Sequence, residues 1–294
     1  MYLRQLETPR VHSGWQCGLP HSLRYRGDER IKEHDLRATR VTVTMDLNAD
    51  LGESFGPWRM GDDESLLGIV TSANLACGFH AGDPQTMIRT AAMARDAGVS
   101  IGAHISYADL RGFGRRPMPV THDELHADVV YQLGAALGVT ASVAVELTHA
   151  KPHGALYNVI ATDRNQARTV ARAIASVRPG LPVYGLAGSV FLDEARAAGL
   201  VPVPEAFADR AYETDGTLRP RSLVGAVLTD PDEIAARVVR LARRGEILAH
   251  EGSPIALAAR TVCVHGETAH ATAIARAIRS ALEAAGVDLR AIEH

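Results

Sequence analysis

The chain has 294 residues, of which 46% are hydrophobic and 22% charged, and its formal net charge is −3 at pH 7. This composition excludes an intrinsically disordered chain, and the mildly acidic balance argues against a dedicated nucleic-acid-binding protein. No apolar run reaches the roughly 18 residues that a membrane span needs. We therefore expect one large domain or two small ones, with neither nucleic acid nor a membrane as partner.

Residues 1–40 differ from the rest of the chain, because they show neither helical nor strand periodicity. They carry 8 Lys/Arg against 5 Asp/Glu, a charge of +3, which leaves −6 on the remainder. We expect a disordered or loosely attached extension, or a start codon assigned too early. Residues 41–294 are predicted to form a single catalytic domain.

Short apolar runs alternate with amphipathic stretches from residue 41 onward. The runs that predict strands are 41–48, 71–77, 99–104, 143–150, 181–187, 200–207 and 261–266. The stretches that predict helices are 62–69, 84–97, 121–138, 163–177, 189–198, 231–244 and 269–285. Aspartate or threonine precedes several of these helices as a cap, and glycine follows several of them.

This alternation predicts an α/β fold, namely a seven-stranded parallel β/α barrel of the TIM type. A doubly wound parallel sheet is the alternative, but no GxGxxG sequence follows the first strand. The segment 246–259 interrupts the rhythm, and we expect a short hairpin there.

Cysteine and lysine are both scarce. Cys17, Cys77 and Cys263 are too few and too scattered for a disulfide framework, and no apolar secretory signal opens the chain, so we expect a cytoplasmic protein with reduced thiols. Only two of the 31 basic residues are lysines, Lys32 and Lys151. In so arginine-rich a sequence, a lysine is retained either by chance or because the guanidinium of arginine cannot replace the ammonium of lysine at that position.

Nearly every predicted strand ends in polar or ionisable residues. In a parallel α/β fold the carboxyl ends of the strands meet at one face, where active sites are built, so these residues are expected to converge. They are Asp46, Asn48, Asp50, Glu53, Asn74, His80, Asp83, His104, His149, Lys151, His153, Glu205, Asp209, Arg210, His265 and Glu267.

The first strand carries Asp46, Asn48 and Asp50 at alternate positions, so their side chains point the same way. Three buried polar groups are costly unless they bind something or one another. We interpret them as part of an active site. The alternative is a hydrogen-bonded plug that closes the barrel mouth.

Two loops add histidine and arginine to this face. His80 lies in a glycine-flanked turn, and the segment 109–117 after His104 contains arginines that bind carboxylates or phosphates through paired hydrogen bonds. A solvated basic loop is the alternative for these arginines, which are Arg111, Arg115 and Arg116. Histidines and carboxylates also suit a divalent metal, but no HExxH spacing is present and the identity of the metal stays unknown.

The densest motif is KPHGALYN, from Lys151 to Asn158. Pro152 and Gly154 fix an irregular backbone after a strand. We expect this backbone to direct Lys151 and His153 into the same end of the barrel. Lysine suits stabilisation of an oxyanion, and histidine suits proton transfer near neutral pH.

Six segments of the chain resemble the LamB/YcsF family. They are DLNADLGESFG from Asp46, TSANLACGFHAGDP from Thr71, DLRGFGRRPM from Asp109, KPHGALYN from Lys151, FADRAYETDGTL from Phe207 and CVHGET from Cys263. The resemblance covers residues 43 to about 286 and implies a barrel of the glycoside hydrolase/deacetylase type. It also implies a component of an ATP-dependent 5-oxoprolinase, which opens 5-oxo-L-proline to L-glutamate together with subunits B and C.

The chain contains no GxxxxGK[ST] sequence, so a P-loop is absent. We hypothesise that subunits B and C supply the ATP site and phosphorylate the lactam oxygen, while this chain directs water onto the ring carbon. Two other functions remain open: a stand-alone metal-dependent amidase or deacetylase, and a non-catalytic subunit that only binds the lactam.

In the favoured scheme each expected site residue receives a role. The water is oriented by one of Asp46, Asp50, Glu53, His80, His104 and His153. Lys151 and the arginine loop offset negative charge, and His265 protonates the leaving nitrogen. The expected substrate-binding residues are Asn48, Asn74, Arg111, Arg115, Arg116, Tyr157, Asp209 and Arg210.

Overall fold

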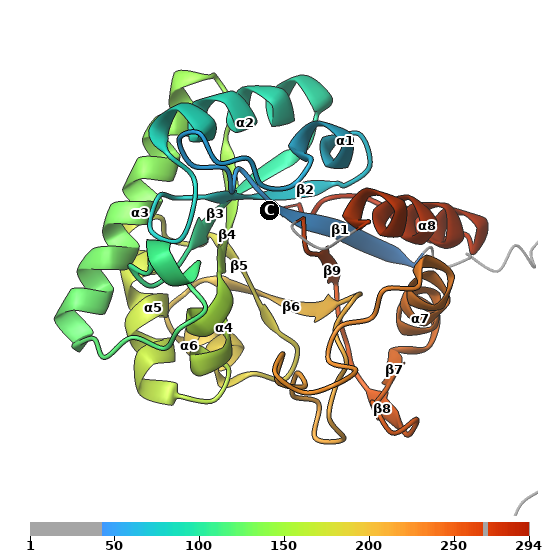
Figure 1. Ribbon diagram of the computed structural model, residues 1–294. Coiled ribbons are helices and arrows are strands. Elements are labelled where there is room, and N and C mark those ends of the chain that lie inside the picture. The colour runs from blue at the N-terminus through green and yellow to red at the C-terminus, as the bar shows by residue number, and fades with distance from the viewer. Residues whose placement is uncertain (1–42, 267–269, 294) are drawn as a thin grey trace, which may run out of the picture. The chain divides into compact units, whose positions relative to one another are not determined.

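The pairing of the strands closes the sheet into a barrel. In the computed structural model, which describes residues 43–266 and 270–293, seven parallel strands pair in the order β1, β2, β3, β4, β5, β6 and β9, and β9 pairs back with β1 (Figure 1). The strands are β1 Thr44–Leu51, β2 Ser72–Ala76, β3 Ser100–Ile105, β4 Leu147–Pro152, β5 Pro182–Leu186, β6 Val201–Phe207 and β9 Thr261–Val264. This confirms the predicted barrel and excludes the doubly wound sheet, whereas the expected extension at 1–40 lies outside the described residues.

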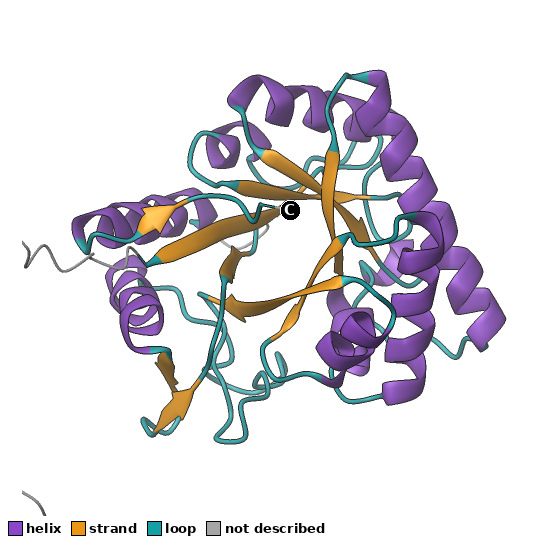
Figure 2. Ribbon diagram, turned by 180° about the vertical axis from the view of Figure 1, so that it is seen from behind, coloured by secondary structure: helices purple, strands orange, loops and turns teal. Residues whose placement is uncertain are grey.

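Helices surround the ring of strands, as the view from behind shows (Figure 2). They are α1 Asp63–Leu67, α2 Pro84–Ala97, α3 His122–Ser142, α4 Gly154–Ile160, α5 Arg164–Val177, α6 Val190–Ala197, α7 Pro231–Arg244 and α8 Ala271–Ala284. The expected hairpin is present outside the barrel, where β7 Glu246–Leu248 pairs antiparallel with β8 Pro254–Ala256. Among the described residues, no helix combines the length and the apolarity needed to cross a membrane.

Local capping signals set the ends of several helices. The Asp83 carboxylate accepts from two backbone N–H groups at the start of α2, and Asp230 does the same for α7. Thr121 and Glu124 form a reciprocal capping box before α3. Because such signals are local, the predicted bounds 84–97 and 231–244 agree with the structure.

Four elements differ from the sequence prediction. α3 continues past Gly138 to Ser142, so β4 begins at Leu147 rather than at residue 143. A glycine inside a helix costs only about 1 kcal/mol, which the burial of α3 against the barrel outweighs. The helix α4 and the short strand β10 (Asp288–Leu289), which pairs with the start of β1, were not predicted.

A glycine in β3 makes room for a buried ring inside the barrel. A Cβ on Gly102 would lie 2.2 Å from the ring of His149. That ring is held on its other side by stacking on Tyr184, with the ring centroids 4.2 Å apart. The ring has no space to retreat, so the position requires glycine.

We expect Gly102→Ala to lower the free energy of unfolding by about 1–3 kcal/mol, since it overpacks the barrel interior. The matched control is Gly134→Ala in α3, where an added Cβ meets nothing within 4 Å. That substitution should stabilise the protein by up to about 1 kcal/mol through helix propensity. Urea unfolding of both variants measures the difference, and equal midpoints would contradict the packing argument.

Candidate active site

Asp46 forms the deepest polar level of the barrel. Its carboxylate accepts hydrogen bonds from the hydroxyl oxygens of Thr71 (2.6 Å), Ser72 (2.7 Å) and Thr261 (2.5 Å). Burial raises the pKa of Asp46, and the three hydroxyl donors offset only part of that rise. Asp46 is therefore part of a hydrogen-bonded plug and does not line the main cavity described below.

Asn48 and Asn74 form the next level. The Asn48 amide nitrogen donates to Glu205 Oε1 (2.9 Å) and Thr261 Oγ1 (2.7 Å), and its oxygen accepts from the Asn74 amide (2.8 Å). The Asn74 amide also donates to Asp50 Oδ1 at 2.9 Å. Both asparagines are thus engaged by protein groups, so the structure supports them as positioning residues for Asp50 and Glu205 rather than as direct substrate contacts.

A buried ammonium ion organises the third level. Lys151 Nζ lies 3.0 Å from Asp50 Oδ1 and 3.0 Å from Glu205 Oε1, and it donates to Cys263 Sγ at 3.0 Å. Burial alone would lower the pKa of Lys151, but the charge of Asp50 and its other neighbours outweighs it and raises that pKa well above the usual range. Burial alone would likewise raise the pKa of Asp50, but His104 and Lys151 hold it well below the ordinary value. Lys151 and Asp50 are therefore both ionised at neutral pH.

Three histidines and a glutamate gather beside this ammonium. His104 Nε2 lies 3.3 Å from Asp50 Oδ2 and 2.9 Å from His153 Nδ1. The His80 ring stacks on that of His153 with centroids 3.9 Å apart, and His80 Nε2 lies 3.6 Å from Glu53 Oε1. Burial lowers the pKa values of His80 and His153 well below 6.5, and the neighbouring histidines lower both further. We refer to Glu53, His80, His104 and His153 as the histidine cluster.

Glycines let three loops close on the histidine cluster. A Cβ on Gly114 would lie 2.4 Å from Ser106 Oγ and 2.8 Å from His80 Cβ, and one on Gly82 would lie 2.7 Å from the Gly52 carbonyl oxygen. These glycines therefore allow the protein's own loops to approach one another closely. Through this close approach the Phe113 carbonyl oxygen reaches His153 Nε2 at 2.9 Å.

Asp209 orients the imidazole of His265, which does not belong to the histidine cluster. The distance from Asp209 Oδ1 to His265 Nδ1 is 2.9 Å, and the imidazole stacks on Phe207 with centroids 5.1 Å apart. Because a carboxylate accepts, Nδ1 carries the proton and Nε2 is the nitrogen left for chemistry.

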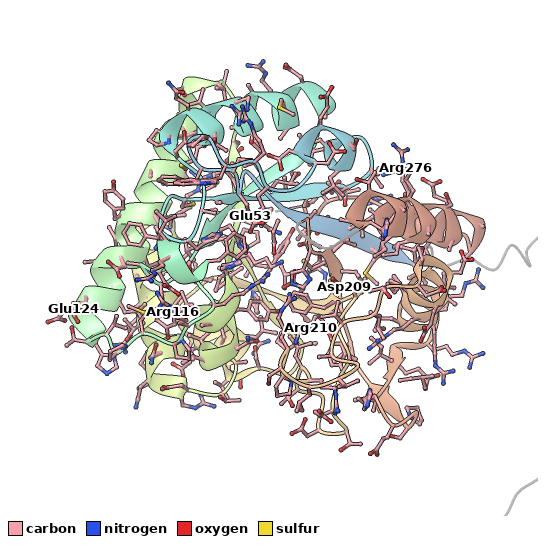
Figure 3. The ribbon with its side chains drawn as sticks, in the orientation of Figure 1. Glu53, Arg116, Glu124, Asp209, Arg210 and Arg276 are labelled. Atoms are coloured by element: carbon pink, nitrogen blue, oxygen red, sulfur yellow. The ribbon has the colours of Figure 1, made fainter. Side chains whose placement is uncertain are left out.

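A cavity of about 480 Å³ opens between these groups, and we refer to it as the main cavity. Asp50, His104, Lys151, His153, Tyr157 and His265 line it together with Arg115, Arg210 and Arg221. Figure 3 shows that Glu53, Asp209 and Arg210 lie over the middle of the barrel, whereas Glu124 and Arg276 lie on its outer helices. The strand ends thus converge, as the sequence predicted.

The three arginines of the segment 109–117 separate in the structure. Arg115 lines the main cavity, whereas Arg111 lines a second cavity with Glu53 and His80. Arg116 is held by Asp109, which its Nε approaches to 3.0 Å. Of these three, only Arg115 is therefore placed to contact a ligand in the main cavity.

Buried Arg210 adds positive charge to the main cavity, besides that of Lys151 and Arg115. Arg210 donates to the carbonyl oxygens of Arg219 (2.6 Å) and Ala226 (3.3 Å), which fixes its guanidinium. Burial lowers the pKa of Arg210 to about 10, so the group stays charged at neutral pH.

Sequence reasoning missed Glu205, Cys263 and Arg221 as members of the site. Glu205 was noted only as a polar residue near a strand end, although a carboxylate within an apolar strand marks a buried ionic partner. Cys263 lies in an apolar strand, and nothing in its sequence neighbours reveals the ammonium that lies 3.0 Å from its Sγ.

Comparisons with known proteins place the chain among its relatives. The sequence profile of the LamB/YcsF family matches residues 45–294. The chain belongs to the LamB/YcsF family. The 5-oxoprolinase A subunit of Mycobacterium avium (strain 104) is 55% identical over 247 residues, which are 84% of this chain and 98% of that protein. A 5-oxoprolinase A subunit of Agrobacterium fabrum is 53% identical, over 84% of this chain and 97% of its own length.

A solved structure shares the LamB/YcsF fold. The lactam utilization protein of Thermus thermophilus is 46% identical and superposes with a TM-score of 0.81, over 85% of this chain and 100% of that one. The implied barrel fold is thereby confirmed.

The position of Asp46 in the plug predicts a pH-dependent stability. Because its pKa is raised above the ordinary 3.8, the folded state holds a proton that the unfolded state releases, so this group destabilises the fold as pH rises through that raised pKa. In Asp46→Asn, which does not titrate, the free energy of unfolding should therefore increase relative to that of the wild type as the pH is raised from about 4 toward the raised pKa of Asp46. Urea unfolding across this range measures the gain, and a difference that shrinks with rising pH would contradict it.

Proposed function

We propose that this chain is the A subunit of a 5-oxoprolinase, which opens 5-oxo-L-proline to L-glutamate while ATP is hydrolysed to ADP and phosphate. The observation that carries the proposal is the 55% identity to a 5-oxoprolinase A subunit over 98% of that protein's length. The geometry supports it, because the main cavity combines fixed cations, an ionised carboxylate and a carboxylate-oriented histidine. We infer a cytoplasmic complex with subunits B and C, which bind most of the ATP.

The cations of the cavity suit an anionic lactam. 5-Oxoproline carries a carboxylate, and phosphorylation of its lactam carbonyl oxygen would add a second anionic group. Arg115 and Arg210 line the cavity and suit these groups through paired hydrogen bonds. Lys151 lies deeper, where its ammonium stabilises negative charge that develops on oxygen during attack at the ring carbon.

The attacking water belongs on the side of the cavity formed by Asp50 and the histidine cluster. Asp50 accepts hydrogen bonds and orients the water, but the low pKa of its carboxyl makes it a weak base. His104 and His153 line the same side of the cavity and accept the proton of the water when no metal ion occupies the histidine cluster.

His265 serves the leaving group in this scheme. When the carbon–nitrogen bond of the ring breaks, the nitrogen needs a proton, and His265 with its Asp209 partner suits that donation in the imidazolium form. When the carbon–nitrogen bond breaks, the former ring carbon carries a phosphorylated carboxyl group. A second water hydrolyses this group to the carboxylate of glutamate and inorganic phosphate, so two waters are consumed overall.

A reconstitution assay tests this division of labour. Cleavage of 5-oxo-L-proline is followed with and without ATP for this chain alone, for subunits B and C alone, and for all three together. We expect turnover only with all three subunits and ATP. Turnover by subunits B and C alone would contradict a catalytic role for this chain and leave it a lactam-binding role. ATP-free turnover by this chain alone would favour the stand-alone amidase. The observation that supports that alternative is the histidine cluster.

Lys151→Met should abolish ATP-coupled turnover, by at least about a hundredfold, because it removes the cation that stabilises the developing charge. It should also destabilise the fold by about 3–5 kcal/mol, since Asp50 and Glu205 then remain buried without their partner.

The double variant Lys151→Met/Asp50→Asn separates the two effects. It removes one charge of each sign, so stability should recover in part while turnover stays absent. Urea unfolding and the coupled assay are measured on both variants. Near-normal turnover in a folded Lys151 variant would remove Lys151 from the mechanism.

A further inference from the structure

Backbone carbonyl groups fix the protons of two rings in the histidine cluster. His104 Nδ1 lies 3.1 Å from the Lys151 carbonyl oxygen, and His153 Nε2 lies 2.9 Å from the Phe113 carbonyl oxygen. A carbonyl oxygen only accepts, so each of these nitrogens carries its hydrogen. The remaining nitrogens, His104 Nε2 and His153 Nδ1, then face each other at 2.9 Å, and His104 Nε2 also lies 3.3 Å from Asp50 Oδ2. Two lone pairs at 2.9 Å repel unless a proton or a metal ion is shared between them.

A shared proton would satisfy His104 and His153 but not the rest of the cluster. Both ring nitrogens of His80 are buried without a hydrogen-bond partner among the described residues. Glu53 Oε1 faces His80 Nε2 at 3.6 Å, beyond hydrogen-bond distance. A buried polar group left unbonded costs about 1–3 kcal/mol, so His80 requires a partner that a proton between the other two rings does not provide.

One metal ion would satisfy all four residues. The candidate ligand atoms of Glu53, His80, His104 and His153 lie within 4.8 Å of one another, and each side chain is at least 95% buried. The carbonyl partners of His104 and His153 are the outer contacts that commonly orient metal-binding histidines. Three imidazoles and one carboxylate suit zinc rather than magnesium or calcium, which prefer oxygen ligands.

A second group of metal-binding residue types, Asp50, Cys263 and His265, is less suitable. Asp50 Oδ1 and Cys263 Sγ already face the Lys151 ammonium at 3.0 Å, and His265 Nδ1 is held by Asp209. Lys151 thus provides the cation of that group, and it would repel a second one.

We propose that Glu53, His80, His104 and His153 form a zinc site beside the Lys151 centre. Zinc binding itself does not depend on the proposed function, whereas its use in lactam opening rests on it. When bound there, zinc polarises an oxygen of water or substrate. This chain's contribution is to hold the four ligands through the loops that Gly82 and Gly114 allow to close.

Metal analysis of the purified full chain tests the site without substrate. The protein is loaded with Zn²⁺, dialysed against metal-free buffer and analysed for metal content, and Co²⁺ loading is followed by visible absorption. We expect one zinc per wild-type chain and its loss in His80→Ala and in the conservative Glu53→Gln. The matched control is His126→Ala, an exposed histidine on α3, which should keep the zinc.

Thermal unfolding gives a second readout. Added Zn²⁺ should raise the midpoint of the wild type and of His126→Ala but not of Glu53→Gln, because only an ion bound to the folded state stabilises it. Equal zinc content in wild type and His80→Ala, or a wild type that retains none, would overturn the site. Zinc binding without lactam turnover in the reconstituted complex would instead count against the proposed function and leave the site intact.

Discussion

The ammonium of Lys151, buried between Asp50 and Glu205, is the interaction on which the interior of this barrel depends. Two carboxylates lie 3.0 Å from one Nζ and all three side chains are almost fully buried, so neither the carboxylates nor the lysine would be stable alone. The three groups come from β4, β1 and β6. Their mutual attraction therefore ties together strands that do not pair with one another, and the closed barrel in turn keeps the three groups buried.

This ion triad also sets the character of the groups around it. The asparagines of the level below are engaged by its carboxylates and are not left to bind a ligand. Asp50 is held ionised, and the low pKa of its carboxyl makes it a poor base. Under the proposed function, turnover and stability are coupled at Lys151, because the same ammonium stabilises reaction charge and neutralises the buried carboxylates.

Local signals account for what the sequence could predict. Strand alternation put Asp46, Asn48 and Asp50 on one side, and the caps at Asp83 and Asp230 fixed two helices. The sequence did not predict α4, because it begins at Gly154, with a positive φ of 56°, directly after His153, whose side chain makes no capping hydrogen bond. The different fates of Arg115 and Arg116 depend on how one loop folds onto Asp109, which spacing does not encode.

The histidine cluster could not be predicted from the spacing of its residues in the sequence either. A motif such as HExxH places two ligands on one helix, so a linear search finds it. Here His80, His104 and His153 follow or end different strands, and only closure of the sheet brings them within reach. The alternatives of active site and hydrogen-bonded plug also proved to be two levels of one interior, with Asp46 below and Asp50 lining the cavity.

The pairing of β10 with the first residues of β1 has a consequence for assembly. Asp288 and Leu289 lie beside Thr44 and Met45, at the amino end of the barrel, while the cavity opens at the carboxyl end. The described chain therefore enters and leaves the barrel at the same end. A surface to which the protein is tethered near residue 293 would hold it by the end remote from the cavity, and the face with the cavity would stay open to solvent.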